Sequence, residues 1–197
     1  MSVTLTETKF NDLPNCLSIT NGDVELIVTT DFGPRVLFYG FKNQKNVFKI
    51  FDGQLKGYDP AVWHSFGGHR LWHAPEVYPR TYYPDNEKVT WKWDGKILTL
   101  TPPDEATNGI GKRIEIVLAE TGADVSLNHT LINTGIWPIE ISAWCLSVMA
   151  PGGRAIIPQE EYKPHPDCLV PARTLVLWYF IKMNDPRTTW GERYIQL

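Results

Sequence analysis

The sequence predicts an all-β protein, and three observations lead to this fold class. Short runs rich in β-branched and aromatic residues recur along the whole chain, several of them alternating polar and apolar residues. Every gap between these runs contains Gly, Pro, Asn or Asp. No stretch of twelve residues has a 3.6-residue apolar period that outcompetes the alternation. Strands joined by short turns indicate an antiparallel β-sandwich.

The first predicted strand, 24–29, is an almost continuous run of β-forming residues. A break at Gly33-Pro34 separates it from the second strand, 35–39, and a short strand follows at 47–51. The remaining strands are expected at 88–93, 96–101, 113–118, 124–131, 138–149, 154–157, 174–183 and 192–197.

Two turn signals join neighbouring strands of this series. Asp94-Gly95 is a typical two-residue hairpin turn, and it follows the alternating segment that holds Trp91 and Trp93. Thr121-Gly122 separates two runs of similar length that pair naturally. The order of strands and turns therefore favours hairpins between neighbours in the chain.

Size and composition fit one domain spanning residues 1–197. The chain has 197 residues, with 43% hydrophobic and 21% charged residues, which are ordinary values for a globular protein. No shift in composition marks a boundary within the chain. A single β-sandwich domain is expected.

The charge pattern and the cysteines narrow the partners and the compartment. The formal net charge is −3 and no basic block occurs, so a nucleic-acid partner is not expected. No apolar run approaches 18 residues, and residues 1–15 lack the apolar core of a signal peptide. The three cysteines are too scattered for a zinc motif. These features predict a cytoplasmic protein with free thiols and no membrane span.

The segment 63–83 is the strongest candidate for a functional site. Three of the five histidines lie between positions 64 and 73, interleaved with arginines and a glutamate. The same segment holds two tryptophans and three tyrosines. Ionisable groups, planar donors and aromatic faces in one place are typical of a site for a polar small molecule.

Three stretches of the chain resemble the galactose mutarotase-like superfamily, which includes the aldose 1-epimerases. Segments 21–26 and 32–36 are similar to that family's opening pair of strands, with a glycine turn before the second. Gly67-Gly68-His69-Arg70 resembles its glycine-led, sugar-binding loop. Segments 127–135 and 138–144 resemble its long central strand pair. The resemblance covers nearly the whole chain and is closer to uncharacterised relatives than to true mutarotases.

The resemblance implies a two-sheet supersandwich that binds sugars on a concave face. Members of the family usually run well beyond this length, so the chain is expected to be a version shortened at its C-terminus. Two family features are not matched here. The family's catalytic glutamate is expected in the last third, about where this chain stops, and segment 142–146 lacks the family's acid histidine.

Mutarotation requires an acid for the ring oxygen and a base for the anomeric hydroxyl. Histidine suits the acid because its pKa lies near working pH, and a carboxylate suits the base. Arginine fixes hydroxyl groups through its planar fork, and tryptophan provides a stacking surface. The candidate catalytic residues are His69, His73 and Glu76, and the candidate substrate-binding residues are Arg70, Trp72, Arg80 and Trp144.

Several of these residues, and His129, also have a structural interpretation. His69 and His73 fit loop residues bonded to backbone carbonyls, and Arg70 fits a simple ion pair with Glu76. His129 alternates within a strand and fits a structural role. Glu76 follows a proline and fits a solvated turn.

Two other functions stay open beside the epimerase hypothesis. A non-catalytic sugar-binding module would keep the aromatic residues and Arg70 without an acid and a base. A metal-dependent enzyme would use His69 and His73, whose i, i+4 spacing gives a zinc pair on a helix. However, the glycines before this segment and Pro75 after it disfavour a helix.

The sequence thus predicts a carbohydrate-binding protein with aldose 1-epimerase-like activity as its leading enzymatic reaction. Its partner is a sugar or a polyol, and no cofactor and no metal are expected. An incomplete supersandwich exposes sheet edges, so formation of a homodimer is also expected.

Overall fold

A computed structural model describes residues 2–197 and confirms the all-β prediction. The chain forms two compact units, one ending at Pro151 and the other comprising Gly152–Leu197. The sequence predicted one domain, since no shift in composition marks a boundary at this position. In the residues that the structure describes, no helix is long and apolar enough to cross a membrane.

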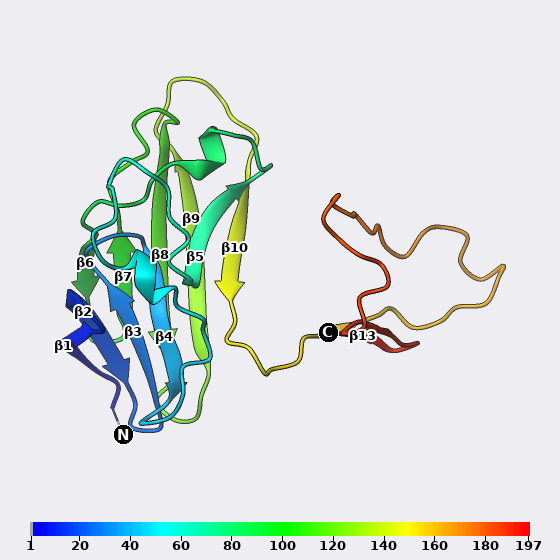
Figure 1. Cartoon of the computed structure of the whole chain (residues 1–197), viewed down its shortest axis with the longest axis horizontal. Helices are drawn as coiled ribbons and strands as arrows, with labels where there is room; N and C mark the ends of the chain where they lie inside the picture. The colour runs from blue at the N-terminus through cyan, green and yellow to red at the C-terminus, as the bar shows by residue number, and fades with distance from the viewer. Residues whose placement is uncertain (1) are drawn as a thin grey trace. The chain divides into compact units, whose positions relative to one another are not determined.

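The first unit is a sandwich of two antiparallel sheets (Figure 1). One sheet has six strands in the order β1-β2-β3-β4-β5-β10 and the other has four in the order β6-β7-β8-β9. The six-stranded sheet contains β1 (Thr4–Phe10), β2 (Leu13–Thr20), β3 (Val24–Thr29), β4 (Arg35–Phe41), β5 (Gly68–Ala74) and β10 (Ser142–Val148). The four-stranded sheet contains β6 (Thr90–Trp93), β7 (Ile97–Thr101), β8 (Ile110–Leu118) and β9 (Val125–Asn133).

The main core lies between these two sheets. The six-stranded sheet contributes Val28, Val36 and Leu71, and the four-stranded sheet contributes Leu98 and Ile114, among other buried residues. A second apolar cluster packs around Phe32, Phe66 and Leu37. Because β4 supplies residues to both clusters, the six-stranded sheet is buried on two faces near its centre.

Several strands lie where the sequence predicted them, including β3, β4, β7 and β8. Asp94-Gly95 joins β6 to β7, as its hairpin signal indicated. The strand predicted at 47–51 is reduced to isolated bridges of Phe48 and Ile50. The prediction of a strand at 174–183 is wrong. This exposed segment pairs with no other strand, so its backbone groups are not part of a sheet.

The strands β1 and β2 were not predicted from the sequence, and β5 was expected to be part of a loop. Gly67 and Gly68, with φ values of 87° and 72°, lie where β5 begins. A Cβ at Gly67 would lie 2.1 Å from the carbonyl oxygen of Lys49, and one at Gly68 would lie 2.2 Å from that of Val36. The glycines therefore let the backbone pass close to two neighbouring segments, after which the chain is extended.

The second unit holds a small three-stranded sheet in the order β11-β13-β12. Its strands are β11 (Ile156–Pro158), β12 (Thr189–Trp190) and β13 (Tyr194–Gln196). Most of its side chains are exposed.

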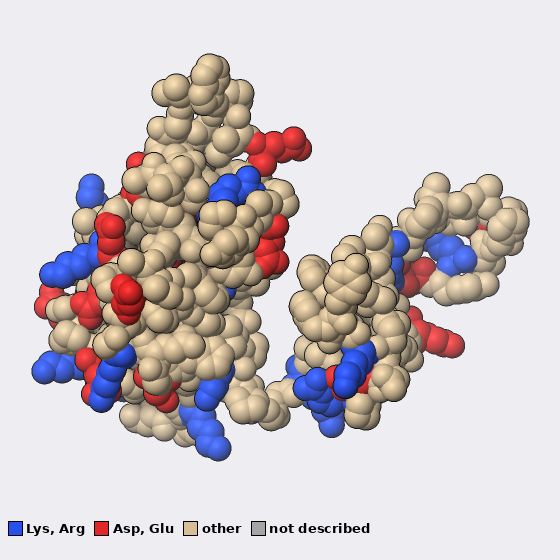
Figure 2. Space-filling model, turned by 45° about the horizontal axis from the view of Figure 1, so that its top comes forward, with Lys and Arg blue, Asp and Glu red and all other residues tan. Residues whose placement is uncertain are grey.

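On the face of the molecule that Figure 2 shows, acidic and basic residues are interspersed, in line with the small net charge.

Candidate functional site

The alternation of side chains along β5 divides the predicted site between two faces of one strand. Leu71 belongs to the core between the sheets, so His69 and His73 face the same interior. The register agrees, because His69 lies opposite Val36, another residue of that core. Arg70 and Trp72 therefore face the opposite side of the six-stranded sheet.

The extended form of β5 also separates the two histidines of the metal hypothesis. Four residues of strand span about 13 Å, whereas the helix that the i, i+4 pattern requires would bring both rings onto one ion. Within residues 2–197, no group of three or more His, Cys, Asp or Glu side chains is placed to hold a metal.

Three aromatic rings gather around Trp72, and we call Trp63, Trp72, Tyr82 and Trp144 together the aromatic face. Trp144 of β10 lies opposite Trp72 in register, and their ring centroids are 5.5 Å apart. Trp63 lies 5.5 Å from Trp72, and Tyr82 lies 5.2 Å from each of these two rings. The register of β5 with β10 thus joins residues that are 72 positions apart in the sequence.

Arg70 lies against this aromatic face. Its Cζ atom is 3.8 Å from the ring centroid of Trp72 and 5.0 Å from that of Trp63, so two indole rings contact one guanidinium. The side chain is largely buried, and burial, followed by the nearby charge of Arg35, lowers its pKa to about 10. Arg70 still carries its positive charge at neutral pH.

A hollow of about 1050 Å³ adjoins the aromatic face. Its lining includes Trp63, Tyr78, Arg80, Tyr82 and Tyr83. Two of the aromatic-face rings therefore also form walls of this open space. Aromatic walls with a few polar groups are typical of small-molecule sites.

A short 3-10 turn, η2 (Arg80–Tyr82), sets the positions of two of these residues. Thr81 is buried at its centre, and its hydroxyl accepts a hydrogen bond of 2.9 Å from the backbone N–H of Val77. Arg80 donates from Nη2 to the carbonyl oxygen of Pro75 at 2.8 Å, and the Tyr82 hydroxyl donates to Glu76. Glu76 is thus held on the aromatic side of the site.

His69 takes part in a separate polar group between the sheets. Its Nδ1 lies 2.8 Å from the Ser147 hydroxyl on β10, and its Nε2 lies 2.9 Å from Nε2 of His129 on β9. Burial lowers the pKa of His69 to about 4, and the neighbouring His129 and Arg35 add to the effect. Burial also lowers the pKa of His129. This pair links the two sheets.

We expect this histidine pair to make stability depend on pH. An unfolded histidine has a pKa near 6.5, so between about pH 4 and pH 6.5 the unfolded chain binds more protons than the folded one. The free energy of unfolding should therefore fall with decreasing pH, and His69 alone should account for about 2 kcal/mol between pH 7 and pH 5. Urea unfolding at several pH values measures this slope.

The His69→Gln variant should show a shallower dependence on pH. The matched control is His165→Gln, since His165 is exposed in the second unit. A slope that both variants leave equally steep would contradict the role of the His69–His129 pair.

His73 belongs to a third cluster of side chains, which is polar and buried and was not predicted from the sequence. Glu105, in the loop before β8, forms an ion pair with Lys112 and lies 3.6 Å from Nε2 of His73. Asn108 donates to the same carboxylate at 2.5 Å. His73, Glu105 and Lys112 are all almost completely buried. Glu105 had no sequence signal beyond its place in a turn rich in proline.

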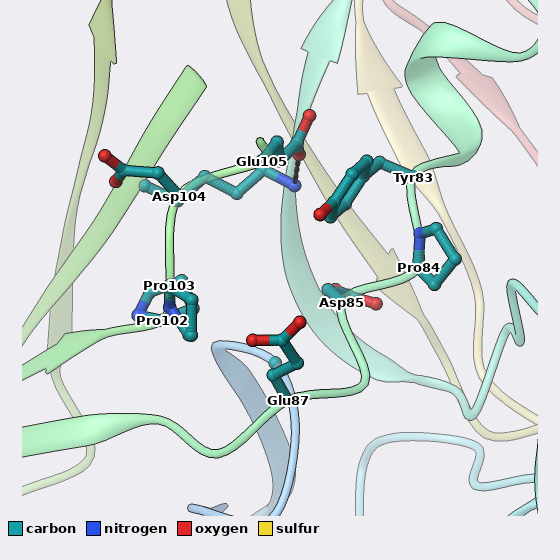
Figure 3. Close-up of a pocket in the computed structure, with 10 residues that line it drawn as sticks. Tyr83, Pro84, Asp85, Glu87, Pro102, Pro103, Asp104 and Glu105 are labelled. Atoms are coloured by element: carbon teal, nitrogen blue, oxygen red, sulfur yellow. Dashed lines mark ion pairs between the residues drawn. The ribbon is translucent and has the colours of Figure 1, made fainter. Parts of the chain in front are cut away.

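Figure 3 shows the small pocket of about 300 Å³ beside this group. Tyr83 lies next to Glu105, while Asp85 and Glu87 enter from the segment before β6. The dashed line is the ion pair of Glu105 with Lys112. The pocket therefore has charged walls and is much smaller than the hollow beside the aromatic face.

A second buried ion pair supports the site from the side of β4. Arg35 is fully buried, and its Nη2 donates to both carboxylate oxygens of Asp85 at 3.3 Å. Its Nη1 donates to the carbonyl oxygens of Ser65 and Gly67, at 2.6 and 3.2 Å. Arg35 thereby fixes the segment that enters β5. Arg35 was predicted to lie on a strand, but no role was expected for it.

The structure brings together only part of the predicted site. Arg70, Trp72 and Trp144 meet at the aromatic face, and Arg80 lines the adjoining hollow. His69 and His73 lie on the other side of β5, each in its own polar group. Trp63 and Tyr82 join the site, and their aromatic character within 63–83 was the signal that pointed to them.

Comparisons with protein-family models, with curated proteins and with solved structures found no match to this chain. The geometry of the site is therefore the basis for the function proposed below.

Proposed function

We propose that the aromatic face and the adjoining hollow bind a sugar or a sugar-like polyol. The observation that carries this proposal is the contact of Arg70 with the rings of Trp72 and Trp63, because Trp63 also lines a large hollow with aromatic walls. A pyranose has apolar C–H faces that pack on aromatic rings and hydroxyl groups that need hydrogen-bond partners. Arg80 and the tyrosines that line the hollow offer such partners, and Arg70 lies behind Trp63.

The proposed activity is binding of the sugar alone. The predicted acid and base do not catalyse opening of its ring. Acid–base catalysis of ring opening needs both groups within hydrogen-bond reach of one bound sugar. His69 and His73 face the interior between the sheets, whereas Glu76 lies on the aromatic side and accepts a hydrogen bond from Tyr82. This separation supports the non-catalytic binding module over the aldose 1-epimerase.

Trp63→Ala tests the proposal, because Trp63 belongs to both the aromatic face and the wall of the hollow. Aromatic contacts of this kind contribute about 0.5–1.5 kcal/mol, so the dissociation constant should rise roughly threefold to tenfold. Saturation-transfer NMR against a panel of aldoses measures binding, and exchange spectroscopy of the same samples measures anomer interconversion.

The matched control is Trp137→Ala, since Trp137 is an exposed tryptophan outside this site. Binding that is equal in both variants would contradict the placement of the sugar. If the protein accelerates anomer exchange and His69→Gln abolishes this acceleration, the result would support the epimerase hypothesis instead.

We propose the cytoplasm as the location and a homodimer as the assembly, on two observations. The three cysteines are free thiols, and Cys145 and Cys168 are exposed, which suits a reducing compartment. The strands β9 and β10 each end their sheet, so each offers an edge to which a second copy can bond.

A further inference from the structure

Arg70 and Arg35 lie opposite each other in register, but only Arg35 forms an ion pair with a carboxylate. Arg35 donates to Asp85 and to two carbonyl oxygens. Arg70 is only 8% exposed, yet among residues 2–197 its side chain has neither a hydrogen bond nor an ion pair, and the charge of Asp85 acts on it only from a distance. A buried charge without a partner destabilises a protein, so an unpaired arginine indicates a group that the protein itself does not supply.

The neighbours of Arg70 are also donors without acceptors. Its own Nη1 and the indole N–H groups of Trp63 and Trp72 are buried and make no hydrogen bond, and the same holds for Nε of Arg80. All four are donors only. The indole rings stabilise the positive charge of Arg70 through their faces, but they accept none of its N–H groups in a normal hydrogen bond.

We propose that the ligand of this site is an acidic sugar, whose carboxylate pairs with Arg70. The inference rests on the proposed function and narrows its substrate class to uronates or aldonates. The carboxylate supplies the acceptors that the donors around Trp63 and Trp72 lack, while the rest of the sugar packs on the aromatic face.

The charge around this site favours a carboxylate over a phosphate. The planar fork of the guanidinium pairs with two oxygens of either group, so the surrounding charge decides between them. Glu76 is held beside Tyr82 on the same side. A phosphate dianion would therefore be repelled more strongly there than a carboxylate, which carries a single charge.

The test is titration calorimetry of the whole chain with glucose, glucuronate and glucose 6-phosphate at pH 7, repeated with galactose and galacturonate. We expect the uronate to bind at least about tenfold more tightly than its neutral parent, as a charge-assisted pair contributes more than a neutral hydrogen bond. The Arg70→Met variant keeps an unbranched apolar stem but removes the guanidinium, and it should bind both sugars equally weakly.

A thermal-unfolding readout guards against a simple loss of fold. Without ligand, Arg70→Met should melt no lower than the unsubstituted protein, because it removes a buried charge that has no ion pair and no hydrogen-bond acceptor. Arg113→Met is the control, as Arg113 is a partly exposed arginine on β8 with its own neighbours. It should leave the preference for the uronate unchanged.

The outcomes separate this inference from the proposed function. Equal affinity for the uronate and the neutral sugar would overturn the inference and leave sugar binding intact. Tighter binding of the 6-phosphate than of the uronate would overturn the assignment of the carboxylate. No binding of any of these sugars would overturn the proposed function itself.

Discussion

Replacing Asp85 with alanine is expected to destabilise the first unit by about 3–5 kcal/mol, the range for removing one partner of a buried ion pair. Arg35 is fully buried, and Asp85 is the only carboxylate to which it donates within the described residues. Burial already lowers the pKa of the guanidinium, and the charge of Asp85 opposes this shift. Urea unfolding measures the change.

The control for Asp85→Ala is Asp12→Ala. Asp12 forms an ion pair of 2.9 Å with Lys56, and both side chains are more than half exposed. Such surface pairs contribute about 0–1 kcal/mol, so this variant should unfold almost like the unsubstituted protein. Equal losses in the two variants would contradict a special role of the buried pair.

Glu105→Gln is the second substitution for which we expect a large effect. It keeps the size of the side chain and an acceptor for Asn108, but it leaves the buried Lys112 without a counter-charge. The expected cost is again about 3–5 kcal/mol in the free energy of unfolding. Chemical denaturation at pH 7 measures it.

The double variant Glu105→Leu with Lys112→Met tests the cause. Replacing a whole buried pair by apolar residues of similar volume is often neutral or stabilising, so the double variant should recover most of the stability lost in Glu105→Gln. A double variant as unstable as the single one would show that packing around Glu105, rather than its charge, holds this region together.

The fold class could be predicted because alternation and turn residues are local signals. Strands such as β7 and β8 and the turn at Asp94-Gly95 follow from their own residues. The strand β5 could not be recognised in the same way, because its histidines and Arg70 resemble a polar loop. Its extended form depends on bonding to β10, which lies about seventy residues further along the chain.

The sequence predicted which residue types gather near the candidate site, but not that they lie on two opposite faces of β5. Segment 63–83 does hold the aromatic residues and the arginine of the aromatic face. Without the strand, however, its residues could not be assigned to two opposite faces, so His69 and Arg70 were expected in one site. Glu105 and Asp85 depend on contacts between distant segments and carry no local pattern.

The central claim is that a sugar binds on the side of β5 that carries Arg70 and Trp72, not on the side of His69. The most direct measurement is a two-dimensional nitrogen–hydrogen NMR titration that follows the indole signals of the tryptophans and the ring signals of the histidines together. We expect the signals of Trp63 and Trp72 to shift with increasing sugar, while those of His69 and His129 stay in place. Shifts confined to the histidines would contradict this account.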